Sequence, residues 1–145
     1  MTLYTIGFTQ KTAQDFFNVL AKSGVKRVLD IRLNNVSQLA GFTKKNDLEF
    51  FLHSICGIDY VHLPILAPSQ DILDEYRKFK GPWSDYERKF LSLMEQRDIK
   101  NKINRELLSD ACLLCSEPKA THCHRRLTAD YFKGIWADLE IHHLE

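Results

Sequence analysis

Reactive and cationic side chains are concentrated in twelve residues near the C-terminus, CSEPKATHCHRR (Cys115–Arg126). The apolar run Ala111–Leu114 precedes them and predicts a buried strand, and a helical pattern follows them. In an open parallel sheet, ligands bind beyond the carboxyl ends of the strands. The segment therefore lies where a catalytic or binding site is expected.

The helix after this segment is marked by Leu127 and the apolar positions that follow it, so it must begin near residues 121–124. Free N–H groups and the positive end of the helix dipole lie at such a start. Cations placed there are unfavourable unless an anion lies between them. We therefore predict an anion site at this helix start, served by Cys123 and Arg125. For Arg126 the favoured interpretation is a side chain in solvent.

Three interpretations are open for Cys115 and Cys123. A cysteine at a helix start beside His and Arg is expected to have a lowered pKa, which would make it a nucleophile. With His122 or His124 the pair could instead bind zinc, although the C-x7-C-H spacing is not a familiar zinc pattern. Both could also be small packed residues that shape the loop. The C-x5-R loop of thiol phosphatases is absent after Cys115. We expect no metal and no other cofactor.

Proton transfer at this segment would fall to Glu117, with assistance from His124. Glu117 lies two residues after Cys115 and is a general acid or base by type. It could equally cap a helix end or pair with an arginine.

A carboxylate and a guanidinium stand together in RVLDIRL (Arg27–Leu33), the second predicted strand. Asp30 and Arg32 are two residues apart, so their side chains should point to the same side of the strand. Arginine can hold an anion with two parallel hydrogen bonds, and Asp30 could act as a base. The alternative is a structural ion pair with other partners.

The ends of two other strands complete the candidate site. Gly7 and Thr9 follow the first predicted strand, and Tyr60 lies in the third. Together with Arg32, Cys123 and Arg125, they are the expected substrate-binding residues. The expected catalytic residues are Asp30, Glu117, His124 and Cys115.

Apolar runs alternate with helical patterns along the whole chain. The predicted strands are residues 3–6, 27–33, 59–64 and 111–114, with a short final strand at 140–144. The helix signals are an N-cap at Thr12 with a stop at Gly24, a cap at Ser69, a capping box at Ser84-Asp85-Tyr86-Glu87 and a continuing face at Ile99, Ile103 and Leu107. This alternation predicts an α/β fold: a single three-layer domain with a mostly parallel, doubly wound sheet of about five strands. The strand order does not follow from the pattern.

Length and composition limit the functional classes. The chain has 145 residues, 44% of them hydrophobic and 27% charged, as in one globular domain. Its net charge of +1 creates no global field for nucleic acid, so any anion site must be local. No apolar stretch reaches the roughly 20 residues of a membrane span, and the start, MTLYTIGF, lacks signal-peptide features. We expect a cytoplasmic protein without membrane contact, and a homo-oligomer stays open.

Four segments, TIGFT, LDIR, GIDYVHLP and above all LLCSEPKATHCHRR, resemble the DUF488 family of small prokaryotic proteins of uncharacterised function. The most specific pattern is LLC-x-E-x6-CHR, followed by D-[VI]-R. Phe8 stands where the family motif T-I-G-H-S has His, and Leu66-Ala67-Pro68 stands where the family has L-G-G. The resemblance implies an α/β fold and supports the same residue cluster. Family members are suspected of acting on nucleic acids or nucleotides.

Three hypotheses follow for the function. The first is an enzyme that acts on a phosphate-bearing substrate, a nucleotide or nucleic acid, held by Arg32, Arg125 and the last helix start. The second is a binding module for an anionic small molecule or nucleic acid that performs no chemistry. The third is a redox or thiol-transfer role for Cys115 and Cys123.

Overall fold

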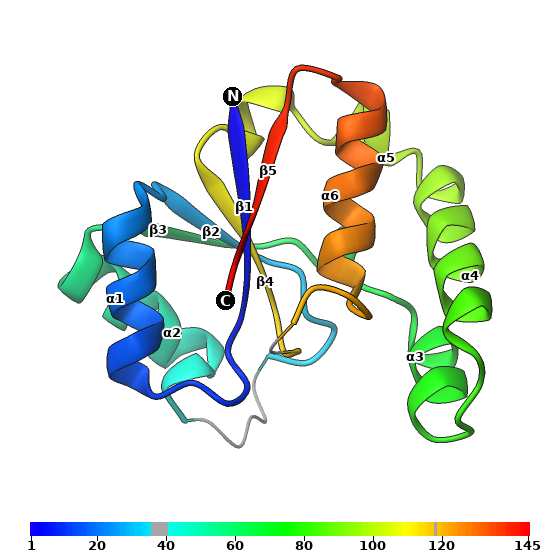
Figure 1. Cartoon of the computed structure of the whole chain (residues 1–145), viewed down its shortest axis with the longest axis horizontal. Helices are drawn as coiled ribbons and strands as arrows, with labels where there is room; N and C mark the ends of the chain where they lie inside the picture. The colour runs from blue at the N-terminus through cyan, green and yellow to red at the C-terminus, as the bar shows by residue number, and fades with distance from the viewer. Residues whose placement is uncertain (36–40, 118) are drawn as a thin grey trace.

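The computed structural model describes residues 1–35, 41–117 and 119–145, and Figure 1 shows their arrangement. These residues form one five-stranded sheet, all parallel, in the order β3-β2-β4-β1-β5. The strands are β1 (Thr2–Gly7), β2 (Arg27–Asp30), β3 (Asp59–His62), β4 (Ala111–Cys115) and β5 (Glu140–Leu144). The predicted α/β fold is confirmed, and so is the short final strand.

Helices cover both faces of this sheet (Figure 1). One face carries α1 (Ala13–Ser23) and α2 (Lys45–Phe51), and α2 runs on into a π-helical turn, η2 (Leu52–Cys56). The other face carries α3 (Gln70–Arg77), α4 (Trp83–Gln96) and α6 (His124–Ile135). The remaining short elements are α5 (Ile99–Lys102) and the 3-10 turns η1 (Gly41–Thr43), η3 (Pro64–Leu66) and η4 (Arg105–Leu108).

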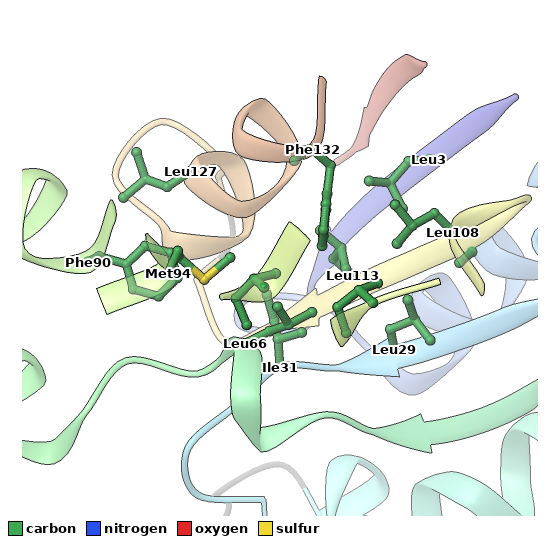
Figure 2. Packing of buried hydrophobic residues seen from close by; sticks show 14 of the residues in the cluster. Leu3, Leu29, Ile31, Leu66, Phe90, Met94, Leu108, Leu113, Leu127 and Phe132 are labelled. Atoms are coloured by element: carbon green, nitrogen blue, oxygen red, sulfur yellow. The ribbon is translucent and has the colours of Figure 1, made fainter. Parts of the chain in front are cut away.

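The hydrophobic core is divided by the sheet into two clusters, because side chains alternate between the faces of a strand. Leu113 of β4 belongs to the cluster under α4 and α6, whereas Cys112 and Leu114 belong to the cluster under α1 and α2. Figure 2 shows the first cluster, in which Phe90 and Met94 of α4 and Phe132 of α6 pack with side chains from the sheet. The central strand β4 is therefore buried on both faces.

The N-cap and stop predicted for the first helix are confirmed. The Thr12 side chain accepts a hydrogen bond from the Asp15 N–H at 3.1 Å. Gly24 ends α1 in the left-handed region, with a φ of 86°. Ser69 occupies the N-cap position of α3, but its side chain makes no capping bond to the backbone there.

Two helix predictions were wrong. The capping box predicted at Ser84 does not form, because α4 already begins at Trp83 with Pro82 as its N-cap. The continuous face predicted through Leu107 is broken, since α5 ends at Lys102 and a separate 3-10 turn follows. Extended backbone at the residue after Lys102 interrupts the helix.

The described helices are also informative about membranes: none of them combines the length and the hydropathy needed to cross one.

Candidate functional site

The carboxyl ends of β2 and β4 lie side by side and supply most of the candidate site. Asp30, the last residue of β2, is level with Leu114 of β4, and Cys115 is level with Gly7 at the end of β1. The predicted strand over residues 27–33 ends at Asp30, so Arg32 lies just beyond the sheet. It follows that the sheet edge brings the Asp30 and Cys115 segments together.

Asp30 and Arg32 form a buried ion pair. Arg32 Nε donates to Asp30 Oδ1 and Nη2 donates to Oδ2, both at 2.8 Å, and Nη2 also donates to the Thr43 carbonyl at 2.7 Å. Among the described residues nothing accepts a hydrogen bond from the third nitrogen, Nη1, although the side chain is only 2% exposed. The Arg32 guanidinium carbon lies 5.4 Å from the centre of the Phe8 ring, which suits a cation–π contact. The Arg32 side chain is therefore fixed in position, while its Nη1 has no acceptor among the described residues.

Tyr60 and Asn35 complete the hydrogen bonding of Asp30. The Tyr60 hydroxyl donates to Asp30 Oδ2 at 2.5 Å, and Asn35 Nδ2 lies 3.4 Å from the same oxygen and 3.3 Å from the hydroxyl. Burial alone would raise the pKa of Asp30, but the hydrogen bonds and charge of Arg32, with the bond from Tyr60, hold it below its ordinary value. Burial and the neighbouring carboxylate raise the pKa of Tyr60. Asp30 is thus an ionised anchor, and Tyr60 stays protonated.

Cys115 and His124 form a second buried pair. Cys115 Sγ lies 3.3 Å from His124 Nδ1, and Nε2 of the same ring bonds to the carbonyl of Ile31 at 2.8 Å. Ile31 stands between Asp30 and Arg32, so the imidazole joins the two pairs. Cys115 is 2% exposed and His124 is 7% exposed.

Charge separation is favoured in the pair of Cys115 and His124. Burial opposes a charged sulfur, but a hydrogen bond from Cys123 and the charge and hydrogen bond of His124 hold the pKa of Cys115 well below its ordinary value. Burial would lower the pKa of His124, yet the facing Cys115 sulfur and the Ile31 carbonyl raise it. Both directions favour a thiolate and an imidazolium, the activated state of a nucleophilic cysteine.

Cys123 lies beside this pair at the start of α6. It is the N-cap residue, and its sulfur accepts from the Arg125 N–H at 3.5 Å. Burial, followed by the hydrogen bond to Cys115 and the charge of that sulfur, raises the pKa of Cys123. Of the two cysteines, Cys115 is therefore the one whose environment favours the thiolate, and that of Cys123 favours the thiol.

The sulfurs of Cys115 and Cys123 and a ring nitrogen of His124 lie within 4.8 Å of one another. Two cysteines and a histidine are a donor set that can hold zinc. However, Arg125 Nη1 lies 3.7 Å from the Cys123 sulfur, where a guanidinium would repel a cation. We therefore interpret the three side chains as a thiol–imidazole cluster.

Arg125 is fully buried and bonded to the chain itself. Its Nε donates to Thr5 Oγ1 at 3.2 Å, and its Nη1 donates to the Glu117 carbonyl as well as contacting Cys123. It does not line the pocket described below. Arg125 thus ties the loop after β4 to strand β1.

Gly7 makes this tie possible. A Cβ atom at Gly7 would lie 1.5 Å from the Glu117 carbonyl oxygen and 2.7 Å from Arg125 Nη1. The Glu117 oxygen is a backbone atom and the contact with it cannot be tolerated, so only glycine lets the loop approach β1 this closely. Thr9 lies elsewhere, in a separate hollow of about 490 Å³ that shares no lining residue with the pocket below.

Glu117 lies at the surface beside an arginine that sequence reasoning missed. Arg77, in the last turn of α3, donates to the Glu117 carboxylate at 2.9 Å, and its side chain is 46% exposed. No signal of type or spacing singles out Arg77, because an arginine at a helix end usually only complements the helix dipole.

A pocket of about 300 Å³ opens between these groups. Its lining includes Arg32, Gln70, Arg77, Cys115, Ser116 and His124. None of the described residues that line it is an Asp or a Glu. The pocket therefore combines two arginines with an activated thiol, which suits an anionic ligand and nucleophilic chemistry.

The structure thus brings most of the predicted site residues together and leaves some apart. Two adjoining clusters form, composed of Asp30, Arg32 and Tyr60 and of Cys115, Cys123 and His124. Gly7 and Arg125 do not line the pocket, and Thr9 lines a different hollow. Asn35 is the other residue that sequence reasoning missed, and a single asparagine beyond a strand carries no signal of its own.

The family model described as "Domain of unknown function DUF488" matches residues 12–132. Comparisons with curated proteins and with solved structures found no match. The match runs from the start of α1 to within α6 and includes both clusters. Since it covers most of the 145 residues, the chain belongs to the DUF488 family.

Proposed function

We propose that the protein is an enzyme that binds a phosphate-bearing substrate, a nucleotide or nucleic acid, in the pocket between Arg32 and Arg77 and attacks it with the Cys115 thiolate. The observation that carries the proposal is the lining of this pocket, which has two arginines and a cysteine–histidine pair without a carboxylate among its described residues. A hydrolase or a group transferase fits this chemistry, because a covalent cysteinyl intermediate can pass its group to water or to another acceptor.

The two arginines have different parts in binding the phosphate. Arg32 is immobilised by Asp30, and its Nη1 has no hydrogen-bond partner among the described residues. A buried donor without a partner costs free energy that an anionic oxygen would recover. Arg77 is half exposed, and among the described residues its side chain bonds to Glu117 alone, so it can exchange that carboxylate for a phosphate. A pocket of about 300 Å³ is small, at the lower end of ligand sites, and fits one phosphate-bearing unit.

The cysteine–histidine pair supplies the chemistry. When the Cys115 sulfur attacks the substrate, it loses the negative charge that stabilises the imidazolium. His124 can then release the proton of Nδ1, a nitrogen 3.3 Å from the sulfur, to the leaving group. Asp30 does not line the pocket and acts as a positioning residue for Arg32. Glu117 is a proton carrier only if the phosphate displaces it from Arg77.

A non-catalytic binding module is the second candidate. It is favoured by the burial of Cys115 and His124, which leaves Arg77 as the more accessible group. In that case the pocket holds an anion and the sulfur reacts with nothing.

Thermal unfolding with ligands tests the binding step. The probes are inorganic phosphate, adenosine 5′-monophosphate and a short single-stranded RNA. A ligand of the folded state adds about 2.7 kcal/mol of stability at a hundredfold excess over its dissociation constant. We expect a shift for the native chain that is reduced in Arg77→Ala. The matched control is Arg88→Ala, a surface arginine of α4 outside the pocket, which should shift like the native chain.

Turnover of the ligands that bind then separates the two candidates. An enzyme should lose turnover in Cys115→Ser while it keeps the thermal shift, and Cys56→Ser should behave like the native chain. Binding without turnover of any probe would favour the binding module. No shift with any phosphate-bearing probe would refute both candidates.

A further inference from the structure

Two cysteine sulfurs lie together at the end of β4, and the proposed reaction uses only one of them. The sulfurs of Cys115 and Cys123 are within 4.8 Å of each other. From this juxtaposition we propose that the pair is a site of reversible oxidation, where a hydroperoxide oxidises Cys115 and Cys123 then closes a disulfide with it. The oxidation depends on the geometry of the cluster alone, and only its effect on turnover rests on the proposed function.

Cys115 is placed to react with the oxidant. It lines the 300 Å³ pocket, through which a small peroxide can reach it, whereas Cys123 does not line that pocket. His124 lies 3.3 Å from its sulfur and favours the thiolate. Cys112, by contrast, is fully buried under α1 and lines none of the pockets described, and burial raises its pKa. Thiolate character and access decide which cysteine is oxidised.

The first step is a two-electron oxidation of sulfur. The Cys115 thiolate attacks one oxygen of the hydroperoxide, the O–O bond breaks, and a sulfenic acid forms on Cys115. The leaving alkoxide or hydroxide takes the Nδ1 proton of His124. One peroxide is thereby reduced to an alcohol or to water.

The second step joins the two sulfurs. The Cys123 sulfur attacks the sulfur of the Cys115 sulfenic acid, the S–O bond breaks, and hydroxide leaves with the Cys123 proton as water. In sum, two thiols and one hydroperoxide give one disulfide, one alcohol and one water. Disulfide sulfurs are about 2.05 Å apart, so the two sulfurs must approach by less than about 3 Å.

The local structure allows this approach. Cys123 is the N-cap of α6, and its sulfur accepts two weak contacts from Arg125, from the N–H at 3.5 Å and from Nη1 at 3.7 Å. Breaking two such contacts is a small cost beside the formation of a covalent bond. Closing the disulfide would mask the nucleophile and protect it from irreversible oxidation to the sulfinic acid.

Peroxide treatment of the reduced full chain tests the proposal. The protein is treated with one equivalent of hydrogen peroxide in buffer with a chelator, so that adventitious metal cannot mask the thiols. We expect the intact mass to fall by two hydrogens and to recover with dithiothreitol, and peptide mapping should find the Cys115–Cys123 link. Cys56→Ser, at a half-buried cysteine outside the cluster, should give the same link.

The two single variants assign the steps. Cys123→Ser should trap the sulfenic acid on Cys115 as a dimedone adduct and then over-oxidise, and Cys115→Ser should form no disulfide. Serine is itself a good N-cap, so Cys123→Ser should fold, which circular dichroism checks. The proposal is overturned if the native chain over-oxidises at Cys115 without the link, or if Cys123→Ser and the native chain give the same products. These mass readouts need no substrate, so a failure of the proposed function would leave them unchanged.

Discussion

Replacing Gly7 by alanine should disrupt the loop that carries both cysteines. The added methyl would lie 1.5 Å from the Glu117 carbonyl oxygen and 2.6 Å from its carbon, so either β1 or the loop must move. The atoms in the way are mainly backbone, which cannot turn aside as the end of a flexible side chain can. The Arg125 guanidinium, which bonds to the same carbonyl, must move as well.

The magnitude follows from these two contacts. Overpacking a well-packed site costs about 1–3 kcal/mol. Losing a hydrogen bond from a buried charged group adds about 1.5–3 kcal/mol. We therefore expect Gly7→Ala to lower the free energy of unfolding by about 3 kcal/mol or more. At a urea slope of about 2 kcal/mol per molar, the midpoint falls by about 1.5 M.

Urea unfolding followed by circular dichroism measures this loss, and Gly134→Ala is the matched control. A Cβ atom at Gly134, within α6, would meet no atom within 4 Å. Alanine is favoured over glycine inside a helix by about 0.5–1 kcal/mol, so the control should be slightly more stable than the native chain. If Gly7→Ala unfolds within about 0.5 kcal/mol of the native chain, the close approach of the loop to β1 is refuted.

Three further predictions concern the two buried pairs. Asp30→Asn leaves the buried Arg32 without a counter-charge and should lower the free energy of unfolding in urea by about 3–5 kcal/mol. The control, Asp138→Asn, breaks an exposed pair and should lower it by less than about 1 kcal/mol. Because the folded pKa of Asp30 lies below its ordinary 3.8, its stabilisation is complete above that pH and should be lost as the pH falls through the folded value; an acid titration of stability that is identical in Asp30→Asn would contradict this. Because the pKa of Cys115 is lowered, its alkylation by iodoacetamide, followed by peptide mass spectrometry, should persist well below pH 9.0 and slow in His124→Gln; equal rates in both proteins would show that the imidazole does not activate the sulfur.

Much of the fold could be predicted because local signals agree with it. The Thr12 cap and the Gly24 stop involve residues close in sequence, so the pattern alone places α1 correctly. The start of α4 could not be placed, because both Pro82 and Ser84 are plausible helix starts and only tertiary packing decides between them. The strand order depends on contacts between distant segments, for which the periodicity carries no signal.

The candidate site was predictable to a similar extent. Asp30 and Arg32 were expected on one side of a strand, and they do meet, although the strand ends before Arg32. The position of Arg125 could not be foreseen, because its direction is decided by the close approach of the Glu117 carbonyl to Gly7. Arg77 reaches the pocket from a helix that follows a different strand, and such convergence exists only in three dimensions.

The central position of β4 has a consequence for how the chain folds. Ala111, its first residue, is level with both Leu3 of β1 and Arg27 of β2, so β4 fills the gap between the two earliest strands. During synthesis, β1 and β2 therefore emerge long before the strand that joins them. Contacts so distant in sequence slow folding, and unpaired strand edges invite aggregation in the meantime. Before Ala111 has been synthesised, β1 and β2 have no strand between them and cannot join one sheet. We therefore expect the nascent chain to depend on chaperones until β4 has emerged.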